Sequence, residues 1–224
     1  MFTAADYRII SDIVFQDNYC GYRPTVVESP DGDGKWDDEK RYAHVADKYL
    51  KEWMGKQPRG TSHETYIRHQ ASILGDYLHR ANERAIEIAI ELGVPKEFWP
   101  VEKYGALRIL EYPPGAVTNS HVDFDLFTLM CYRNIADDFH YIDWSDHLLE
   151  ANKLNQQIHF GEILGLVVPG YKATRHEVIA DPAERAQYSM VYFAIPDWEA
   201  ELPDGQTVGK WLEERLERSR KETK

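Results

Sequence analysis

Two histidines and an aspartate are the residues of this chain best suited to bind a metal ion. The first two ligands stand two positions apart, in His121-Val122-Asp123, and the second histidine is His176. In an extended strand, residues i and i+2 point to the same side, so the imidazole of His121 and the carboxylate of Asp123 can converge on one ion. Two histidines and one carboxylate on one face of a metal are typical of non-haem Fe(II) sites that activate O₂, because three coordination positions stay open. His121, Asp123 and His176 are therefore a candidate Fe(II) site. Taken alone, the H-x-D pattern is also typical of a structural pairing of a histidine with an aspartate, so the residues around it decide between the two interpretations.

The three predicted ligands lie in the second half of the chain, where the apolar pattern changes from a helical period to alternation. Alternation predicts short strands, and Pro- and Gly-containing turns separate them. The expected strands cover residues 107–112, 126–132, 157–168, 176–180 and 187–195. Several short strands at close spacing favour an antiparallel sandwich or barrel, which can bring distant ligands together.

Helices are expected to support this β-rich part from both sides in the sequence. One helix is predicted over residues 37–54 and another over residues 208–220. Between them, Thr61 and Glu64 form a capping-box pattern, after which an apolar stripe continues to Leu92 with spacings of three and four. We therefore expect an α+β fold in a single domain. Its parts are a mainly helical lead-in (residues 1–100), a β-rich core (residues 101–203) and a C-terminal helix (residues 204–224).

The composition excludes several classes of protein. The chain has 224 residues, of which 43% are hydrophobic and 12% aromatic, and this is enough apolar area for one folded core. A net charge of −12 repels phosphate, so neither nucleic acid nor an anionic membrane surface is expected as a partner. Cys20 and Cys131 are too few for a disulfide framework, and no signal peptide or membrane-spanning run is visible. We expect a cytoplasmic protein of unknown oligomeric state.

Five segments of the β-rich part resemble, in order and spacing, motifs of the isopenicillin N synthase-like, 2-oxoglutarate/Fe(II)-dependent dioxygenases. LRILEYPPG (residues 107–115) is similar to the strand before the family's metal motif, and HVDFDLFTLM (residues 121–130) to its H-x-D motif and the following Leu-Thr-Leu strand. IHFGEIL (residues 158–164) is similar to its Gly-Asp-x-Leu hairpin. GYKATRHEV (residues 170–178) is similar to its second-histidine segment, and QYSMVYFAIP (residues 187–196) to its R-x-S strand. The resemblance covers residues 104–203.

The resemblance implies a double-stranded β-helix, or jelly roll, with iron held in its mouth. The family's iron ligands fall on His121, Asp123 and His176, and all three are intact. Related halogenases lack the carboxylate ligand, so the presence of Asp123 implies oxygenation. The implied cofactors are Fe(II), O₂ and 2-oxoglutarate as co-substrate, and the implied partner is a small organic molecule.

One position departs from the family pattern. The R-x-S strand pairs an arginine with a serine to hold the distal carboxylate of 2-oxoglutarate, but here Gln187 precedes Ser189. A neutral amide binds a dicarboxylate less well than a guanidinium does. Arg185 lies two residues earlier, on the same side of a regular strand, and either supplies the missing charge or caps a nearby turn. Arg108 is a weaker substitute, and Tyr112 is either a hydroxyl donor to the carboxylate or a hydrogen-bonded core residue.

Three functions follow from these observations. The first is a 2-oxoglutarate-dependent dioxygenase that hydroxylates a C–H bond of a small molecule and releases succinate and CO₂. The second is an oxidase of the isopenicillin N synthase type, in which the substrate binds the iron and supplies all the electrons. The third is a redox-neutral or non-enzymatic metal-binding jelly roll, which would present three or four histidines. His159 is the nearby histidine, and we expect it on the outer face of its strand.

The substrate pocket is expected between the helical lead-in and residues 134–155. Phe139, Tyr141, Trp144 and His147 lie in that segment and can line a pocket. The segment is rich in aromatic and acidic side chains, which favours a small amphipathic or cationic molecule.

Overall fold

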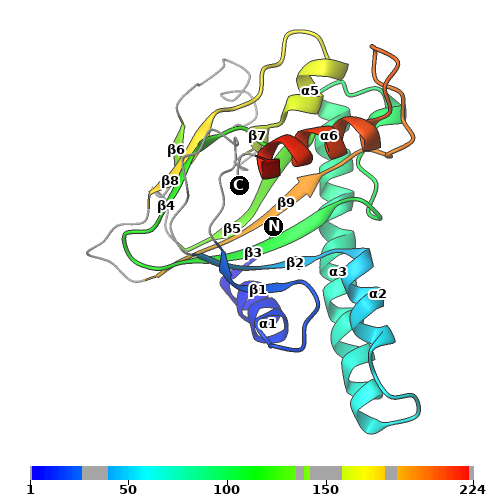
Figure 1. Ribbon diagram of the computed structural model, residues 1–224, viewed down its shortest axis with the longest axis vertical. Coiled ribbons are helices and arrows are strands. Elements are labelled where there is room, and N and C mark those ends of the chain that lie inside the picture. Colours follow the sequence, from blue (N-terminus) through cyan, green and yellow to red (C-terminus); the bar gives the residue numbers. More distant parts are fainter. Residues whose placement is uncertain (1, 27–39, 135–138, 142–157, 180–185, 222–224) are drawn as a thin grey trace.

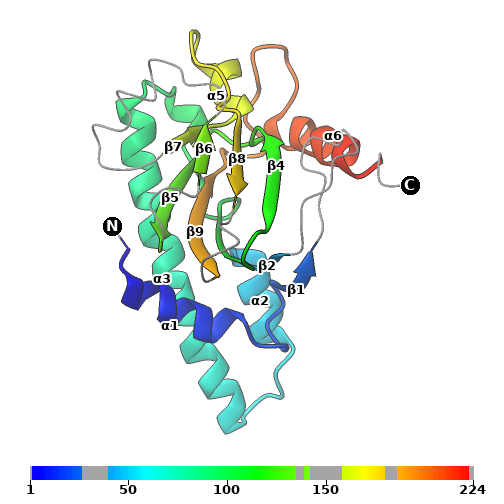
Figure 2. The same ribbon diagram turned by 90° about the vertical axis from the view of Figure 1, so that its left-hand side faces the viewer.

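The fold consists of two antiparallel sheets and a layer of helices. The computed structural model of the protein describes residues 2–26, 40–134, 139–141, 158–179 and 186–221. The small sheet, the large sheet and the long helix α3 (Ser62–Glu91) form three successive layers (Figures 1 and 2). The predicted combination of helices and antiparallel strands is therefore confirmed.

The large sheet has the strand order β1-β2-β3-β9-β5-β7, and the small sheet has the order β4-β8-β6. The large sheet comprises β1 (Tyr22–Val26), β2 (Lys40–Val45), β3 (Ala106–Tyr112), β9 (Gln187–Ala194), β5 (Phe127–Arg133) and β7 (Ile158–Phe160). The small sheet comprises β4 (Val117–His121), β8 (His176–Ile179) and β6 (Phe139–Tyr141). From β3 to β9, successive strands of the described chain alternate between the two sheets. The chain therefore passes back and forth between two layers, which brings segments distant in sequence together.

Strand β3 contributes to two different cores, because successive residues of a strand point to opposite faces. Leu107 and Ile109 face the helices and belong to the main core. Leu110 and Tyr112 face the small sheet and pack near Val178 of β8. This second group, which we call the inter-sheet cluster, consists of Tyr42, Leu110, Tyr112, Ala116, Met130, Val178 and Val191.

Helix α3 covers the face of the large sheet opposite the small sheet, and it matches the predicted helix. Ile67 and Leu74, on its apolar stripe, are fully buried. Thr61 caps its first turn, since the hydroxyl accepts a hydrogen bond from the backbone N–H of Glu64 at 3.0 Å. The Glu64 carboxylate accepts from the backbone N–H of Gly60 at 2.5 Å instead of from Thr61. The predicted capping box is therefore confirmed in its first half and displaced by one residue in its second.

Five shorter helical segments complete the described part of the chain. They are α1 (Ala4–Val14), α2 (Asp47–Gly55), the 3₁₀ turn η1 (Lys96–Phe98), α5 (Glu162–Val167) and α6 (Val208–Lys221). Helix α6 confirms the helix predicted over residues 208–220. No helix among the described residues combines the length and the apolar character needed to cross a membrane.

Two predictions of secondary structure are wrong in part. The helix predicted over residues 37–54 is replaced by β2 over residues 40–45, because this segment pairs with β3, and α2 begins only at Asp47. The strand predicted over residues 157–168 ends at Phe160, and α5 follows it. Ile163, Leu164 and Val167 are buried together on this short helix. A continuous apolar run fits a buried helix as well as a buried strand, so the sequence pattern did not distinguish them.

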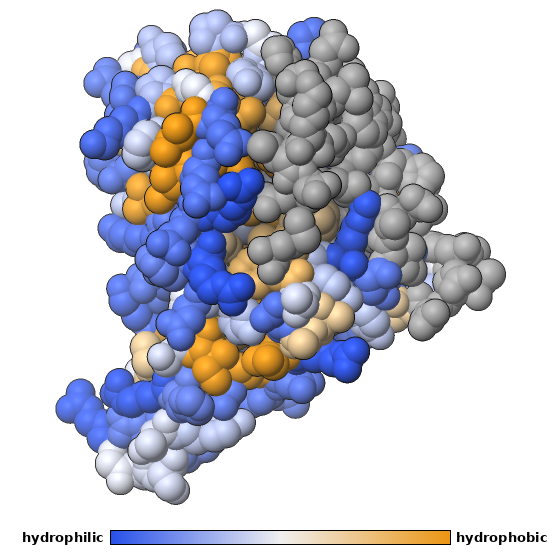
Figure 3. Space-filling view, turned by 180° about the vertical axis from the view of Figure 1, so that it is seen from behind, coloured by the Kyte–Doolittle hydropathy of each residue, from blue (hydrophilic) through white to orange (hydrophobic). Residues whose placement is uncertain are grey.

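The surface is mainly hydrophilic on the side that Figure 3 shows, with apolar residues gathered in separate patches. Large exposed hydrophobic side chains in the described ranges are spread over four helices. They are Ile9, Tyr66, Ile90, Leu166 and Leu216. Single exposed apolar residues of this kind are normal on a soluble surface and need no further explanation.

A buried hydrogen bond joins the helical layer to the large sheet and can be tested by substitution. The hydroxyl of Tyr192, on β9, donates to Oδ1 of Asn82, on α3, at 2.7 Å. Tyr192→Phe removes the donor and leaves the Asn82 carbonyl buried, so we expect the free energy of unfolding to fall by about 1–3 kcal/mol. Urea denaturation measures this change. Tyr66→Phe, at a tyrosine of α3 that is 49% exposed, is the matched control, and an equal loss there would contradict the assignment.

Candidate metal centre

His121 and His176 are brought together by the pairing of β4 with β8. His121 is the last residue of β4 and lies directly opposite His176, the first residue of β8. Their ring centroids are 4.4 Å apart. Asp123 follows β4, and its backbone carbonyl accepts a hydrogen bond from the N–H of Glu162 at 2.9 Å. This contact anchors the loop that carries the carboxylate to the first turn of α5.

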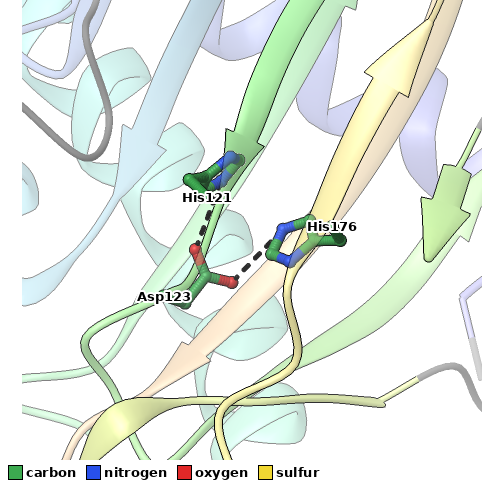
Figure 4. A group of neighbouring side chains, drawn as sticks. All are labelled: His121, Asp123 and His176. Atoms are coloured by element: carbon green, nitrogen blue, oxygen red, sulfur yellow. Dashed lines mark ion pairs between the residues drawn. The ribbon is translucent and has the colours of Figure 1, made fainter. Parts of the chain in front are cut away.

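The three side chains point toward one another (Figure 4). Asp123 Oδ1 lies 3.6 Å from Nε2 of His121, and Oδ2 lies 3.8 Å from Nε2 of His176. One ligand atom from each residue lies within 4.8 Å of the other two, so the group can hold a metal ion. Among the described residues, no other group of histidines, cysteines and carboxylates meets this condition.

Backbone carbonyls fix the orientation of both imidazoles. Nδ1 of His121 lies 2.7 Å from the carbonyl oxygen of Asn119, and Nδ1 of His176 lies 3.0 Å from that of Thr174. A carbonyl oxygen can only accept, so each Nδ1 must carry the hydrogen. In the neutral imidazole, the lone pair is then on Nε2, the atom that faces Asp123. This tautomer is the one that a metal ligand bound through Nε2 requires.

Asp123 is held as a carboxylate ion. Burial opposes its ionisation, but the positive charges that His176 and His121 carry when protonated, together with the hydroxyl of Thr128, outweigh burial and lower the pKa of Asp123 to about 2. The Thr128 hydroxyl lies 2.5 Å from Asp123 Oδ2. An ionised, oriented carboxylate is ready to bind a cation without first losing a proton.

Asp125 shares the Thr128 hydroxyl with Asp123, and its pKa is shifted in the opposite direction. Burial and the negative charge of Asp123 raise the pKa of the Asp125 carboxyl well above its ordinary value. Thr128 Oγ1 lies 3.0 Å from Asp125 Oδ2 and also contacts Asp123. A hydroxyl has one hydrogen, so Thr128 donates to one of these two carboxyl groups at a time. Gly161 permits this packing, because a Cβ there would collide with Asp125 Oδ1.

The prediction that His159 lies on the outer face of its strand is wrong. His159 is 1% exposed, and its ring centroid lies 4.2 Å from that of His176. The reason is register: His159 of β7 is paired with Thr128 of β5, and directly opposite residues share a face of the sheet. His159 nevertheless lies outside the group of three residues that can hold an ion. The sequence carried no signal for this position, because the pairing of β7 with β5 is not written in either segment alone.

The residues predicted to hold the co-substrate are only partly described. Gln187 and Ser189 lie two residues apart on β9, and both are buried, at 2% and 1% exposure. Gln187 Oε1 and Ser189 Oγ have no hydrogen-bond partner among the described residues. Tyr112 of β3 is paired with Gln187 and is buried on the same face. Arg185 lies outside the described residues.

The residues predicted to line the substrate pocket contribute little to the description. Phe139 and Tyr141 belong to β6, and nothing is described beyond their backbone pairing with β8. Trp144 and His147 lie outside the described residues. The interpretation that this segment favours a cationic molecule therefore stays a prediction.

Lys40 is a cation near the co-substrate residues that sequence reasoning missed. It is 4% exposed, and its Nζ donates to the hydroxyl of Thr118, on β4, at 3.3 Å. The ammonium group therefore lies between the two sheets. Arg133 of β5, paired with Ser189, is a second cation on this face. Lys40 was overlooked because residues 37–54 were expected to be helical, whereas in β2 it shares a face with Tyr42 of the inter-sheet cluster.

Contacts with neighbouring side chains hold Arg108 on the same face of the large sheet. Its Nε donates to Nε2 of His44, on β2, at 2.5 Å. Its guanidinium carbon lies 4.7 Å from the ring centroid of Tyr42 and 4.8 Å from that of Phe193. Burial, and then the charge of Arg108, lower the pKa of His44 well below its ordinary value. His44 is therefore neutral and can accept the hydrogen bond.

Comparison with known proteins gives a fold but no sequence family. No family model matches the sequence, and no curated protein matches it. A protein from Shewanella oneidensis, described as a candidate oxygenase, is similar in structure at 20% identity, over 96% of this chain and 87% of that chain, with a TM-score of 0.54.

Two further solved structures hold ligands. A full-length Neurospora crassa protein, in complex with alpha-KG (2-oxoglutarate), is 15% identical over 94% of this chain and 77% of that chain, with a TM-score of 0.55. JOX2, in complex with 2OG, Fe and JA, is 13% identical over 93% of this chain and 71% of that chain, with a TM-score of 0.54. At these identities, the likeness shows that the chain shares the fold of these proteins, and it confirms the resemblance at the level of the fold.

The neutral state of His44 predicts how stability depends on pH. Below about pH 6.5, the unfolded chain binds a proton at His44 that the folded protein does not, so the free energy of unfolding should fall as the pH falls. The slope from this residue is at most about 1.4 kcal/mol per pH unit. His44→Gln, whose amide oxygen can accept from Arg108, should remove this part of the slope between about pH 6.5 and about pH 5. Urea denaturation across this range tests it.

The control for that measurement is His69→Gln, at an exposed histidine of α3. It should keep the slope of the unsubstituted protein. If His44→Gln also keeps that slope, His44 is protonated in the folded protein, and its role as an acceptor for Arg108 is wrong.

Proposed function

We propose that the protein is a non-haem Fe(II) enzyme that uses 2-oxoglutarate and O₂ to oxidise a C–H bond of a small organic molecule. The observation that carries the proposal is the convergence of His121, Asp123 and His176 on one point. Two neutral imidazoles and one carboxylate on one face of a metal leave three positions open, as O₂ activation requires. The fold shared with the Neurospora crassa protein and JOX2, whose structures hold 2-oxoglutarate, supports the same function.

The two sheets, on this proposal, are the walls of a double-stranded β-helix. The alternation of successive strands between the large and the small sheet supports this winding. Its consequence is that β4 and β8, which carry the histidines, lie opposite β9, which carries Gln187 and Ser189. A molecule bound between the sheets can then reach both the metal and β9.

The donor set fits Fe(II). His121 and His176 present Nε2 lone pairs, because their Nδ1 hydrogens are engaged by the carbonyls of Asn119 and Thr174. Asp123 supplies the negative charge, and Thr128 restrains one of its oxygens. When bound, Fe(II) and 2-oxoglutarate together activate O₂ for attack on the substrate, and 2-oxoglutarate is released as succinate and CO₂.

The residues of β9 fit a carboxylate. Buried polar atoms without hydrogen-bond partners are rare, and each is costly unless a ligand or water satisfies it. Gln187 and Ser189 provide two such atoms on one face of one strand. The Ser189 hydroxyl can donate to a carboxylate directly, and the Gln187 amide can donate once it turns its NH₂ group inward. Tyr112, which is buried and paired with Gln187, is a third polar side chain in the same region.

Lys40 supplies the positive charge that the family's arginine would provide. It precedes Arg41, which is paired with Glu111, so continuing the same register places Lys40 opposite Tyr112. Its ammonium group is buried beside Thr118, in the space between the sheets. A cation in a buried environment interacts strongly with a carboxylate, because water screens the charges little there. Lys40, Ser189 and Gln187 together therefore form the anchor that we propose for the distal carboxylate of 2-oxoglutarate.

This anchor also favours the dioxygenase over the substrate-oxidising alternative. An enzyme whose substrate supplies all the electrons needs no second dicarboxylate ligand between the sheets. Gln187 and Ser189 carry buried polar atoms without hydrogen-bond partners among the described residues, and a bound dicarboxylate would satisfy them once the Gln187 amide turns its NH₂ group inward.

Loss of a histidine ligand tests the metal centre. His121→Ala and His176→Ala each remove one of three donors, so we expect Fe(II) binding and turnover to be lost while the far-UV circular dichroism stays unchanged. Anaerobic titration with Fe(II), followed by metal analysis of the desalted protein, measures the binding. His69→Ala, on the exposed face of α3, is the control and should bind one equivalent of Fe(II). Full Fe(II) binding by either ligand variant would show that the centre is elsewhere.

Co-substrate binding tests the anchor. Anaerobic protein with Fe(II) should develop the visible charge-transfer band of a chelate when 2-oxoglutarate is added, and its titration gives the Kd. Lys40→Met removes a charge-assisted contact, so we expect this Kd to rise about tenfold to a hundredfold. Lys51→Met, at an exposed lysine of α2, should leave the Kd unchanged.

The same titration separates the other cations. Arg185→Met and Arg133→Met are compared with Lys40→Met under identical conditions. A larger rise in Kd for one of the arginine variants, with no rise for Lys40→Met, would move the anchor to that arginine. Absence of the charge-transfer band, together with no succinate in the presence of substrate, would favour the substrate-oxidising alternative.

A further inference from the structure

Arg108 is a fixed cation whose charge is not neutralised within the described part of the chain. Its contacts there are the hydrogen bond from Nε to His44 and the two rings of Tyr42 and Phe193. No carboxylate among the described residues forms an ion pair with it, although the chain carries an excess of acidic residues. Charged side chains that are taken out of water are normally paired with an opposite charge. An arginine without a carboxylate partner is therefore a candidate site for an anion from outside the chain.

The contacts of Arg108 hold the guanidinium in one orientation. The bond to His44 uses Nε, which leaves the two terminal nitrogens available for a planar, bidentate contact. The rings of Tyr42, from β2, and Phe193, from β9, lie against the group and restrict its rotation. Because the side chain is already ordered, it loses little conformational entropy when an anion binds.

A series of contacts through β9 and β5 leads from Arg108 to Asp123. Phe193, whose ring lies against the guanidinium, is paired with Thr128 of β5. Thr128 in turn contacts the carboxylate of Asp123. Arg108, Phe193 and Thr128 all lie on the face of the large sheet that looks toward the small sheet, as their register with Val191 and the inter-sheet cluster requires.

The position differs from that of the co-substrate anchor. Along β3, Arg108 is paired with Val191, Leu110 with Ser189, and Tyr112 with Gln187. With a rise of about 3.4 Å per residue, the backbone of Arg108 lies about 7 Å along the strand from the row of Ser189 and about 14 Å from the row of Gln187. The two cationic positions are therefore separate along the strand, and Arg108 lies toward the end at which Thr128 and Asp123 meet.

From this juxtaposition we propose that Arg108 binds a carboxylate group of the organic substrate, and that the substrate is an anion. The proposal rests on the proposed function and adds the chemical class of the molecule oxidised. The terminal nitrogens of Arg108 match the two oxygens of a carboxylate, and this contact fixes one end of the substrate between the two sheets. Leu110 and Met130, in the neighbouring inter-sheet cluster, favour an apolar body for the rest of the molecule.

The aromatic and acidic segment of residues 134–155 favoured an amphipathic or a cationic molecule, and a carboxylate with an apolar body agrees with the first of these and not with the second. Most of that segment lies outside the described residues. Arg108 and the three residues that it contacts, His44, Tyr42 and Phe193, all lie within them. A carboxylate ligand would neutralise the guanidinium that lies against the rings of Tyr42 and Phe193. A cationic ligand would be repelled by the same group.

Matched pairs of small molecules test the proposal without turnover. The probes are hexanoate and 3-phenylpropanoate, each compared with its uncharged amide, and binding to the anaerobic protein is measured by calorimetry with Fe(II), with and without 2-oxoglutarate. We expect at least one carboxylate to bind more tightly than its amide. Arg108→Met should raise the Kd of that carboxylate about tenfold or more, leave the amide unchanged and alter the Kd of 2-oxoglutarate less than about twofold.

Arg108→Lys keeps the charge but loses the planar fork and the bond to His44. It should restore part of the carboxylate affinity that Arg108→Met loses, which a purely structural role for Arg108 would not predict. The lysine variant also keeps the test valid if the methionine variant does not fold, as judged by thermal unfolding.

Three results would overturn the proposal. The first is a protein that binds no carboxylate probe in preference to its amide. The second is an Arg108→Met protein with unchanged carboxylate affinity. The third is a rise in the Kd of 2-oxoglutarate for Arg108→Met with none for Lys40→Met, which would make Arg108 the co-substrate anchor. Failure of the proposed function itself is read separately, from Fe(II) binding by the His121→Ala and His176→Ala variants.

Discussion

The pairing register of β4 with β8 is the constraint on which the metal centre depends. Backbone hydrogen bonds hold His121 directly opposite His176, and a shift of one residue in either strand would turn one imidazole to the other face of the small sheet. Asp123 follows two residues later, in a loop tied to α5 by Glu162. The three donors are thus positioned by main-chain geometry, which side-chain substitutions elsewhere alter little.

The two carboxyl groups at the candidate metal centre, Asp123 and Asp125, have pKa values shifted in opposite directions. The pKa of Asp123 is lowered by His176 and His121, when these carry a positive charge, and by the Thr128 hydroxyl, whereas burial and the charge of Asp123 raise the pKa of Asp125, two residues on. Thr128 lies between them and donates to one of them at a time. The segment between β4 and β5 therefore carries two carboxyl groups whose pKa values are shifted in opposite directions.

The three candidate metal ligands could be predicted from the sequence, because His121 and Asp123 are only two residues apart and a motif resemblance marked His176. Strand periodicity does not place Asp123, which follows β4 in a loop held by the N–H of Glu162. The strands β3, β5, β8 and β9, the capped helix α3 and helix α6 were predictable because each has a local pattern. His159 and Lys40 were not, because their positions depend on which strand lies beside β7 or β2. Helix α5 was missed because a continuous apolar run has no period that separates helix from strand.

Strand β2 lies outside the β-rich part of the sequence but contributes residues to the same sheet. His121, Asp123 and His176 come from the β-rich part, whereas Lys40, Tyr42 and His44 come from a strand that precedes α2 and α3. That strand is held in place by the segment before it: the Tyr19 hydroxyl donates to the His44 carbonyl, and the His44 N–H donates to the carbonyl of Gly21. Sequence change in the first 45 residues can therefore alter side chains that face the small sheet, while the three candidate metal ligands stay as they are. Conversely, a fragment trimmed to the β-rich part would keep His121, Asp123, His176 and Arg108 but lose Lys40 and the His44 acceptor of Arg108.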